Sequence, residues 1–201
     1  DMSDSYFNSG SLEIDYVMSS KTILIAAYSL SVRDFAPGSH SLENSLIGGF
    51  RQYFSPNLYL DGKAGIDITD SYTGKLYTTP QFHASLTGDL DDRSSVNFAF
   101  KKENSLNAYT QDVFDSWRIS SSYNRQLLER LSFGATVFYG SGRYKSLGIN
   151  DDFFGANGSI SYTLTRTLRL RMAYGYSQTD SDRENRGYSR NNASVEIAGE
   201  F

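Results

Sequence analysis

The sequence predicts an all-β protein, an antiparallel up-and-down β-barrel that crosses a membrane with its strands. Three observations predict it. Apolar and polar residues alternate along segments of roughly 10–13 residues, near the length that a tilted strand needs to cross a bilayer. Short and long links between these segments alternate along the chain. The longest apolar run, residues 22–28, is far shorter than the roughly 18 residues of a membrane-spanning helix.

Six segments show the alternation most clearly, from the first third of the chain to its end. Their apolar faces are, in chain order, Leu58, Leu60, Ala64, Ile66 and Ile68; Val96, Phe98 and Phe100; Leu131, Phe133, Ala135, Val137 and Tyr139; Phe154, Ala156, Gly158, Ile160, Tyr162 and Leu164; Leu168, Leu170, Met172, Tyr174 and Tyr176; and Ala193, Val195, Ile197 and Phe201. Polar or small residues fill the positions between them. A period of two with unlike faces indicates strands that separate an apolar medium from a polar one.

The links between the segments support a barrel over a sandwich. Short links fall at 19–21, 55–57, 90–93, 128–130 and 165–167, and longer polar links at 36–41, 70–74, 104–112, 146–152 and 179–189. An outer-membrane barrel has brief periplasmic turns and longer external loops, whereas a Greek-key sandwich has no reason for this order. We count about eleven strands, and we expect 12 or more in the complete protein because such barrels have even strand numbers.

Composition agrees with this class. The mean hydropathy of −0.45 is low because every second residue of a barrel strand is polar. Tyr and Phe gather toward strand ends, as in the aromatic girdles of such barrels, although aromatics are common in any strand. We expect one transmembrane barrel domain over residues 1–201, or the C-terminal part of a larger barrel. The net charge of −4 argues against a nucleic-acid partner.

The C-terminal third carries runs that resemble a known family. Residues 131–139, 158–170, 174–182 and 188–195 are similar to the "putative beta-barrel porin 2" family of Gram-negative outer membranes, whose members often belong to exopolysaccharide secretion loci. The resemblance implies an outer-membrane location, and outer-membrane lipid, lipopolysaccharide and the barrel-assembly machinery as partners. The terminal Phe201 resembles the signal that this machinery recognises, while Gly199 and Glu196 depart from it.

Charged residues on the polar face are the candidate functional residues. An Arg or Lys that faces lipid near the bilayer centre costs about 2–4 kcal/mol, so these side chains must face water or one another. They line an aqueous channel, or they interlock and fill a narrow barrel. The predicted pore-lining residues are Arg33, Arg51, Lys63, Asp67, Lys101, Arg118, Arg169, Arg171, Glu196 and Glu200.

These observations predict a porin-like channel, not an enzyme, for passive passage of small solutes or an exported polysaccharide. The alternative is a non-conducting barrel that binds envelope-complex proteins. A third hypothesis is phospholipid hydrolysis by Ser85, with His83 as base and Asn97 as orienting residue, a set that resembles outer-membrane phospholipase A. Ser85 lacks that enzyme's following Asn-Gly, and His83 and Ser85 point away from lipid. We therefore expect no catalytic residue, no metal site and no cofactor; the chain has no Cys and only two His.

Overall fold

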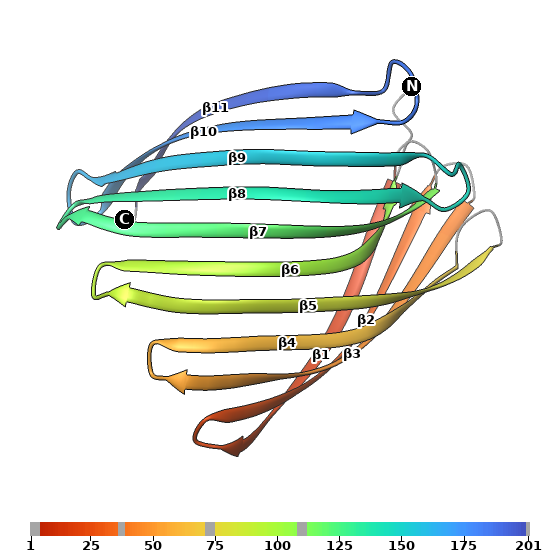
Figure 1. Cartoon of the computed structure of the whole chain (residues 1–201), viewed down its shortest axis with the longest axis horizontal. Coiled ribbons are helices and arrows are strands. Elements are labelled where there is room, and N and C mark those ends of the chain that lie inside the picture. The colour runs from red at the N-terminus through yellow and green to blue at the C-terminus, as the bar shows by residue number, and fades with distance from the viewer. Residues whose placement is uncertain (1–4, 36–38, 71–74, 108–111, 200–201) are drawn as a thin grey trace.

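The computed structural model describes residues 5–35, 39–70, 75–107 and 112–199. They form one antiparallel sheet in which every strand pairs with the next along the chain (Figure 1). Its eleven strands are β1 (Ser5–Ser19), β2 (Thr22–Phe35), β3 (Ser39–Ser55), β4 (Leu58–Asp70), β5 (Leu76–Asp91), β6 (Ser94–Asn107), β7 (Asp112–Leu128), β8 (Leu131–Tyr144), β9 (Asn150–Thr163), β10 (Leu168–Ser181) and β11 (Tyr188–Gly199). The predicted all-β, up-and-down order is confirmed. The described residues include no helix that is long and apolar enough to cross a membrane.

The strands are longer than a bilayer crossing requires. They run from 12 residues in β11 to 17 in β3 and β7, against the roughly 9–11 that a tilted strand needs. The extra length takes up part of the links that were predicted to be long: β3 already begins at Ser39, and β10 continues to Ser181. The short links at 20–21, 56–57, 92–93, 129–130 and 164–167 share one end of the sheet, the short-turn end, which lies on the left of Figure 1 for β4 to β11.

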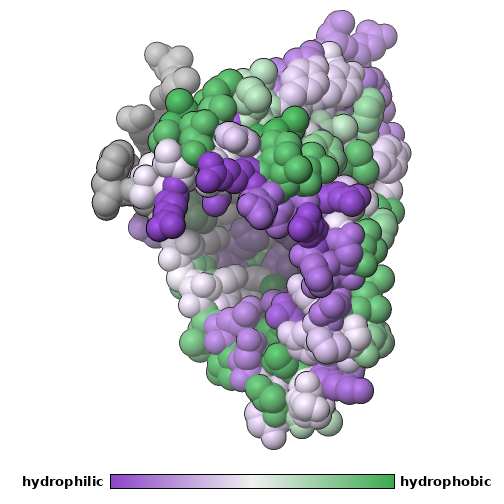
Figure 2. Space-filling model, turned by 90° about the vertical axis from the view of Figure 1, so that its left-hand side faces the viewer, coloured by the Kyte–Doolittle hydropathy of each residue, from purple (hydrophilic) through white to green (hydrophobic). Residues whose placement is uncertain are grey.

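The two faces of the sheet differ in polarity. Residues that are register partners on neighbouring strands share a face, so the pairing assigns each side chain to one side. The convex face carries exposed apolar residues from every strand, for example Ile14, Leu24, Leu46, Ile66, Leu86, Phe98, Ile119, Val137, Ile160, Met172 and Val195. Figure 2, a view from the short-turn end, shows hydrophilic residues around a central hollow and hydrophobic residues along the right-hand outer edge. An apolar exterior around a polar interior is the arrangement of a transmembrane barrel wall.

The sheet is split between β5 and β6 at the end opposite the short turns. Pairing between these strands begins only at Phe82 and Lys102, so residues 76–81 of β5 pair with β4 alone. Pro80 lies in this stretch, where its missing N–H costs no hydrogen bond to β6. In Figure 1, β6 bends away from β5 at its right-hand end.

The separated end of β6 lies against the inner face of β4. Asn104 belongs to the outward face of β6, yet its amide donates to the hydroxyl of Thr69, which is on the inner face of β4, at 3.3 Å. Thr79, on the inner face of β5, is 0% exposed, and Val113 of β7 is 1% exposed. The ends of β6 and β7 therefore cover part of the concave face.

Candidate functional site

The concave face holds the predicted pore-lining residues that the structure describes. The register places on it Arg33, Arg51, Lys63, Asp67, Lys101, Arg118, Arg169, Arg171 and Glu196. Glu200 and Phe201 lie outside the described residues. Asp67 differs from the others because it is 4% exposed: the Gln81 amide donates to it, beneath the end of β6.

Three ion pairs join charged residues on the concave face of the first six strands. Arg51 binds Asp61 through two hydrogen bonds, Nε to Oδ1 at 2.6 Å and Nη2 to Oδ2 at 3.0 Å. Lys63 Nζ lies 3.2 Å from Glu13 Oε2, which joins β4 to β1 across the concave side. Lys101 pairs with Glu103 on the same strand. The concave side chains of Arg51, Lys63 and Lys101 are therefore each matched by a carboxylate.

Four basic residues form a row across β4 to β7 on the concave face. Lys63 is the register partner of His83, His83 of Lys101, and Lys101 of Arg118. We call Lys63, His83, Lys101 and Arg118 the basic row. Within this row Lys101 and Arg118 are like charges directly opposite one another on neighbouring strands, and such a pair is destabilising. Alternation along the chain predicts which face each residue takes, but only the register shows that these four are neighbours.

Aromatic rings surround Arg118 at the end of this row. Its guanidinium carbon lies 4.7 Å from the centre of the Phe138 ring and 5.2 Å from that of Phe153. Both rings are on the concave face, on β8 and β9. They border a hollow of about 330 Å³, which is also lined by Glu103, Phe114 and Ser116.

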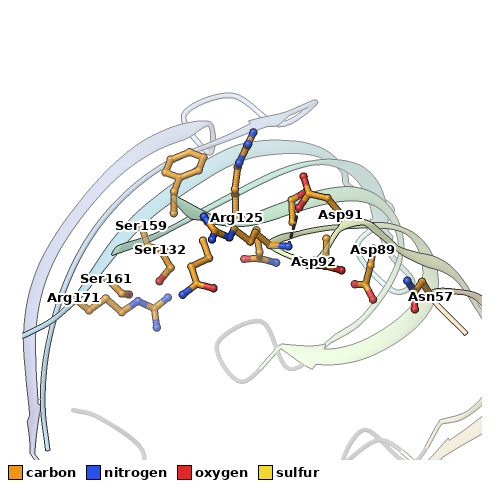
Figure 3. Close-up of a pocket in the computed structure, with 16 residues that line it drawn as sticks. Asn57, Asp89, Asp91, Asp92, Arg125, Ser132, Ser159, Ser161 and Arg171 are labelled. Atoms are coloured by element: carbon orange, nitrogen blue, oxygen red, sulfur yellow. Dashed lines mark hydrogen bonds between the residues drawn. The ribbon is translucent and has the colours of Figure 1, made fainter. Parts of the chain in front are cut away.

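A second hollow, of about 590 Å³, lies at the short-turn end of the concave face. Figure 3 shows Ser132, Ser159, Ser161 and Arg171 on the inner side of the arch, with Asp89 and Asn57 further along it. At the neighbouring turn the Arg93 N–H donates to Asp91 Oδ1 at 2.8 Å. This end of the lumen wall carries hydroxyls and charges of both signs.

The structure does not bring the hydrolase candidates into a catalytic arrangement. His83 and Ser85 share the inner face of β5, but no hydrogen bond joins them within the described part of the chain. Asn97 donates to Thr87 Oγ1 at 2.8 Å and is the register partner of Thr87. Ser85 is in register with Ala99, so Asn97 does not lie directly opposite Ser85. A nucleophile needs its base within hydrogen-bond reach. Among the described residues there is also no group of three or more His, Asp or Glu that could hold a metal ion.

Comparisons with known proteins agree with the family resemblance of the sequence. Residues 113–201 match the family described as "Putative beta-barrel porin 2". No curated protein matches the chain. The matching segment runs from β7 to the end of the chain, so it contains Arg118, Arg169, Arg171 and Glu196 but none of the candidates on β1 to β6.

The fold is similar to that of solved outer-membrane proteins. The FrpB iron transporter of Neisseria meningitidis is similar over 98% of this chain, with a TM-score of 0.73 and 8% identity; the chain spans 40% of that protein's length. OmpT of Vibrio cholerae is similar over 98% of both chains, with a TM-score of 0.48 and 8% identity. The KdgM porin is similar over 100% of this chain and 99% of its own, with a TM-score of 0.43 and 12% identity.

Proposed function

We propose that this outer-membrane β-barrel, whose residues 113–201 match the putative beta-barrel porin 2 family, is a channel for the passive passage of polar solutes. The concave face would border water and the convex face would border lipid. The proposal includes no chemical step, because solutes would cross by diffusion along the polar wall. Outer-membrane lipid and lipopolysaccharide are the proposed partners of the convex face, and the role of Phe201 in assembly stays a prediction.

One observation carries the proposal: charged side chains on the concave face lack ion-pair partners. Within the described residues, Arg118, Arg169 and Arg171 take part in no salt bridge. A dry, interlocked interior would leave these guanidinium groups buried without partners, at a cost of several kcal/mol each. A water-filled lumen removes that cost.

We propose small polar solutes as the cargo. An exported polysaccharide is the other cargo that the family resemblance supports, and it would need a lumen that accepts a continuous chain. Ser132, Ser159 and Ser161 offer hydroxyl groups at the short-turn end. These groups would suit a small polar solute or a polysaccharide, because either can form hydrogen bonds with them.

One observation favours a second candidate, a non-conducting barrel. The ends of β6 and β7 cover part of the concave face, where Asp67 and Thr79 are buried. If the rest of the lumen were filled in the same way, the barrel would bind partners and conduct no ions.

Planar-bilayer recording on the full chain separates the two candidates. A channel gives discrete current steps, and Ser159→Trp should lower their size because Ser159 faces the lumen. Ile160→Trp, the next residue on the same strand but on the lipid side, should leave the step size unchanged. Folded, inserted protein that gives no current would overturn the channel and favour the second candidate.

A further inference from the structure

We propose that Arg118 binds the carboxylate of an anionic sugar inside the lumen. This inference rests on the proposed channel, because it needs the concave face to be open to water, and it adds the class of solute. It is carried by three features of the concave wall: the way the guanidinium is held, the charges around it, and the groups that line the adjoining hollow.

Glycines hold the aromatic rings flat against the wall. Gly155 is the register partner of Phe138, and a Cβ on Gly155 would lie 2.5 Å from the Phe138 ring. Gly140 is the register partner of Phe153, and a Cβ there would also lie 2.5 Å from the ring. Each ring thus occupies the space of a missing side chain on the neighbouring strand. The rings give Arg118 a flat aromatic surface, and a guanidinium that stacks on aromatic faces is oriented before a ligand arrives.

Arg118 is the member of the basic row whose permanent charge has no carboxylate partner. Lys63 and Lys101 bind Glu13 and Glu103, whereas Arg118 has no ion pair or side-chain hydrogen bond within the described residues. Asp151, which lines the same hollow, already pairs with Arg186 at 3.2 Å. Lys101 is the register partner of Arg118, and Glu103, which also lines the hollow, pairs with Lys101. A carboxylate bound at Arg118 would give this guanidinium the ion-pair partner that Lys63 and Lys101 already have.

The adjoining hollow fits a sugar acid. Its volume of about 330 Å³ is near the lower limit of ligand pockets, which suits a solute of one ring. The planar fork of an arginine binds a carboxylate through two parallel hydrogen bonds. Ser105, Ser116 and Thr179 offer hydroxyl groups for the sugar hydroxyls, and Phe114 offers an apolar ring face.

Equilibrium binding tests the site without requiring any current. The full chain, folded in detergent micelles, is titrated calorimetrically with glucuronate and with glucose, which differ in the carboxylate. The parent chain should bind glucuronate at least about tenfold more tightly than glucose, since charge-assisted bidentate hydrogen bonds are worth about one tenfold step or more in affinity. Arg118→Gln should abolish this preference, and Arg118→Lys should retain part of it because it keeps the charge but loses the fork.

Arg143→Gln is the matched control. Arg143 is on β8 but on the outward face, so its substitution removes the same charge without touching the site and should leave the glucuronate preference unchanged. Retention of the native heat-dependent electrophoretic mobility shows that each variant is folded. Equal binding of the two sugars by the folded parent, or an undiminished preference in Arg118→Gln, would overturn the inference.

The failure of this site and the failure of the channel give different results. Current steps in a bilayer without a glucuronate preference in micelles would overturn the sugar-acid site and support the channel. A glucuronate preference that depends on Arg118, in a protein that passes no current, would overturn the channel and support the site.

Discussion

At the scale of single residues, glycine and aromatic side chains work in pairs on the concave face. Gly140, Gly142 and Gly155 each stand where an added Cβ would lie within 2.6 Å of a phenylalanine ring atom. A phenylalanine that lies across a glycine covers the exposed backbone and takes a fixed orientation. These glycines are therefore required for space, since none of the three has a positive φ.

Gly155→Ala should destabilise the protein. The new Cβ would meet the Phe138 ring at 2.5 Å and the Tyr176 carbonyl oxygen at 2.8 Å, so both strand and ring must shift. Overpacking of this kind costs ~1–3 kcal/mol. The measurement is the free energy of unfolding by urea in lipid vesicles.

Gly158→Ala, on the same strand, is the control for this prediction. A Cβ at Gly158 would meet nothing within 4 Å, so the free energy of unfolding should change by no more than about 0.5 kcal/mol. Equal losses for the two substitutions would mean that the cost comes from strand propensity, not from the ring of Phe138.

The sequence predicts which face of the sheet a residue occupies better than it predicts which residues lie beside it on the neighbouring strands. Period-two alternation places Lys63, Lys101 and Arg118 on the polar face, and the structure agrees. Their alignment with His83 depends on the offset between strands, which the turns and the curvature of the sheet determine together. The glycine–phenylalanine pairs depend on the same offset. For this reason the basic row and the site at Arg118 could not be derived from the sequence.

At the scale of strands, the separation of β5 from β6 is the main departure from a regular barrel wall. The sequence has a visible signal for it in Pro80, because proline in a strand indicates an edge or a break in pairing. Alternation is lost at the separated part, where Thr78 of β5 and Lys102 and Asn104 of β6 are polar residues at outward positions, and residues 104–112 were predicted to be a link. Where β6 goes after leaving β5 is decided by packing against β4, which no local pattern reports.

A pair of introduced cysteines tests this position of β6. Asn104 and Thr69 are on strands that are not neighbours in the sheet, yet their side chains are hydrogen-bonded. The chain has no cysteine of its own, so Asn104→Cys with Thr69→Cys should form a disulfide on mild oxidation. The measurement is the change in electrophoretic mobility before and after reduction.

The matched pair for this experiment is Asn104→Cys with Thr87→Cys. Thr87 is also on the inner face of the wall but near the short-turn end of β5, far along the strand from Asn104. This pair should stay reduced. Cross-linking of both pairs at similar rates would show that the end of β6 does not occupy a defined place on β4.

At the scale of the whole molecule, the sheet is a curved wall with two edges. Within the described residues β1 and β11 do not pair with each other. A bilayer offers no water to satisfy the backbone groups of an edge strand, so both edges need a partner there. Because β1 and β11 run in the same direction, only an odd number of further strands between them would close the barrel with antiparallel pairs. The total number of strands would then be even. The expected total of 12 or more agrees with this count and stays a prediction.

The fold class was accessible from the sequence because membrane strands follow a strict rule. Each crossing must present apolar residues to lipid and satisfy its backbone in the sheet, and this rule makes the alternation recur in strand after strand. The lengths of the links were less predictable, since strands such as β6 and β10 continue into residues that were predicted to be loops. The breadth of the wall depends on curvature and appears only in the structure.

Cysteine accessibility on β9 shows whether the concave face borders water while the convex face borders lipid. Ser159→Cys and Ile160→Cys are placed one at a time in the full chain, in lipid vesicles, and exposed to a charged, water-soluble thiol reagent. We expect rapid labelling at 159 and slow labelling at 160. Rapid labelling at 160 with protection at 159 would contradict this expectation.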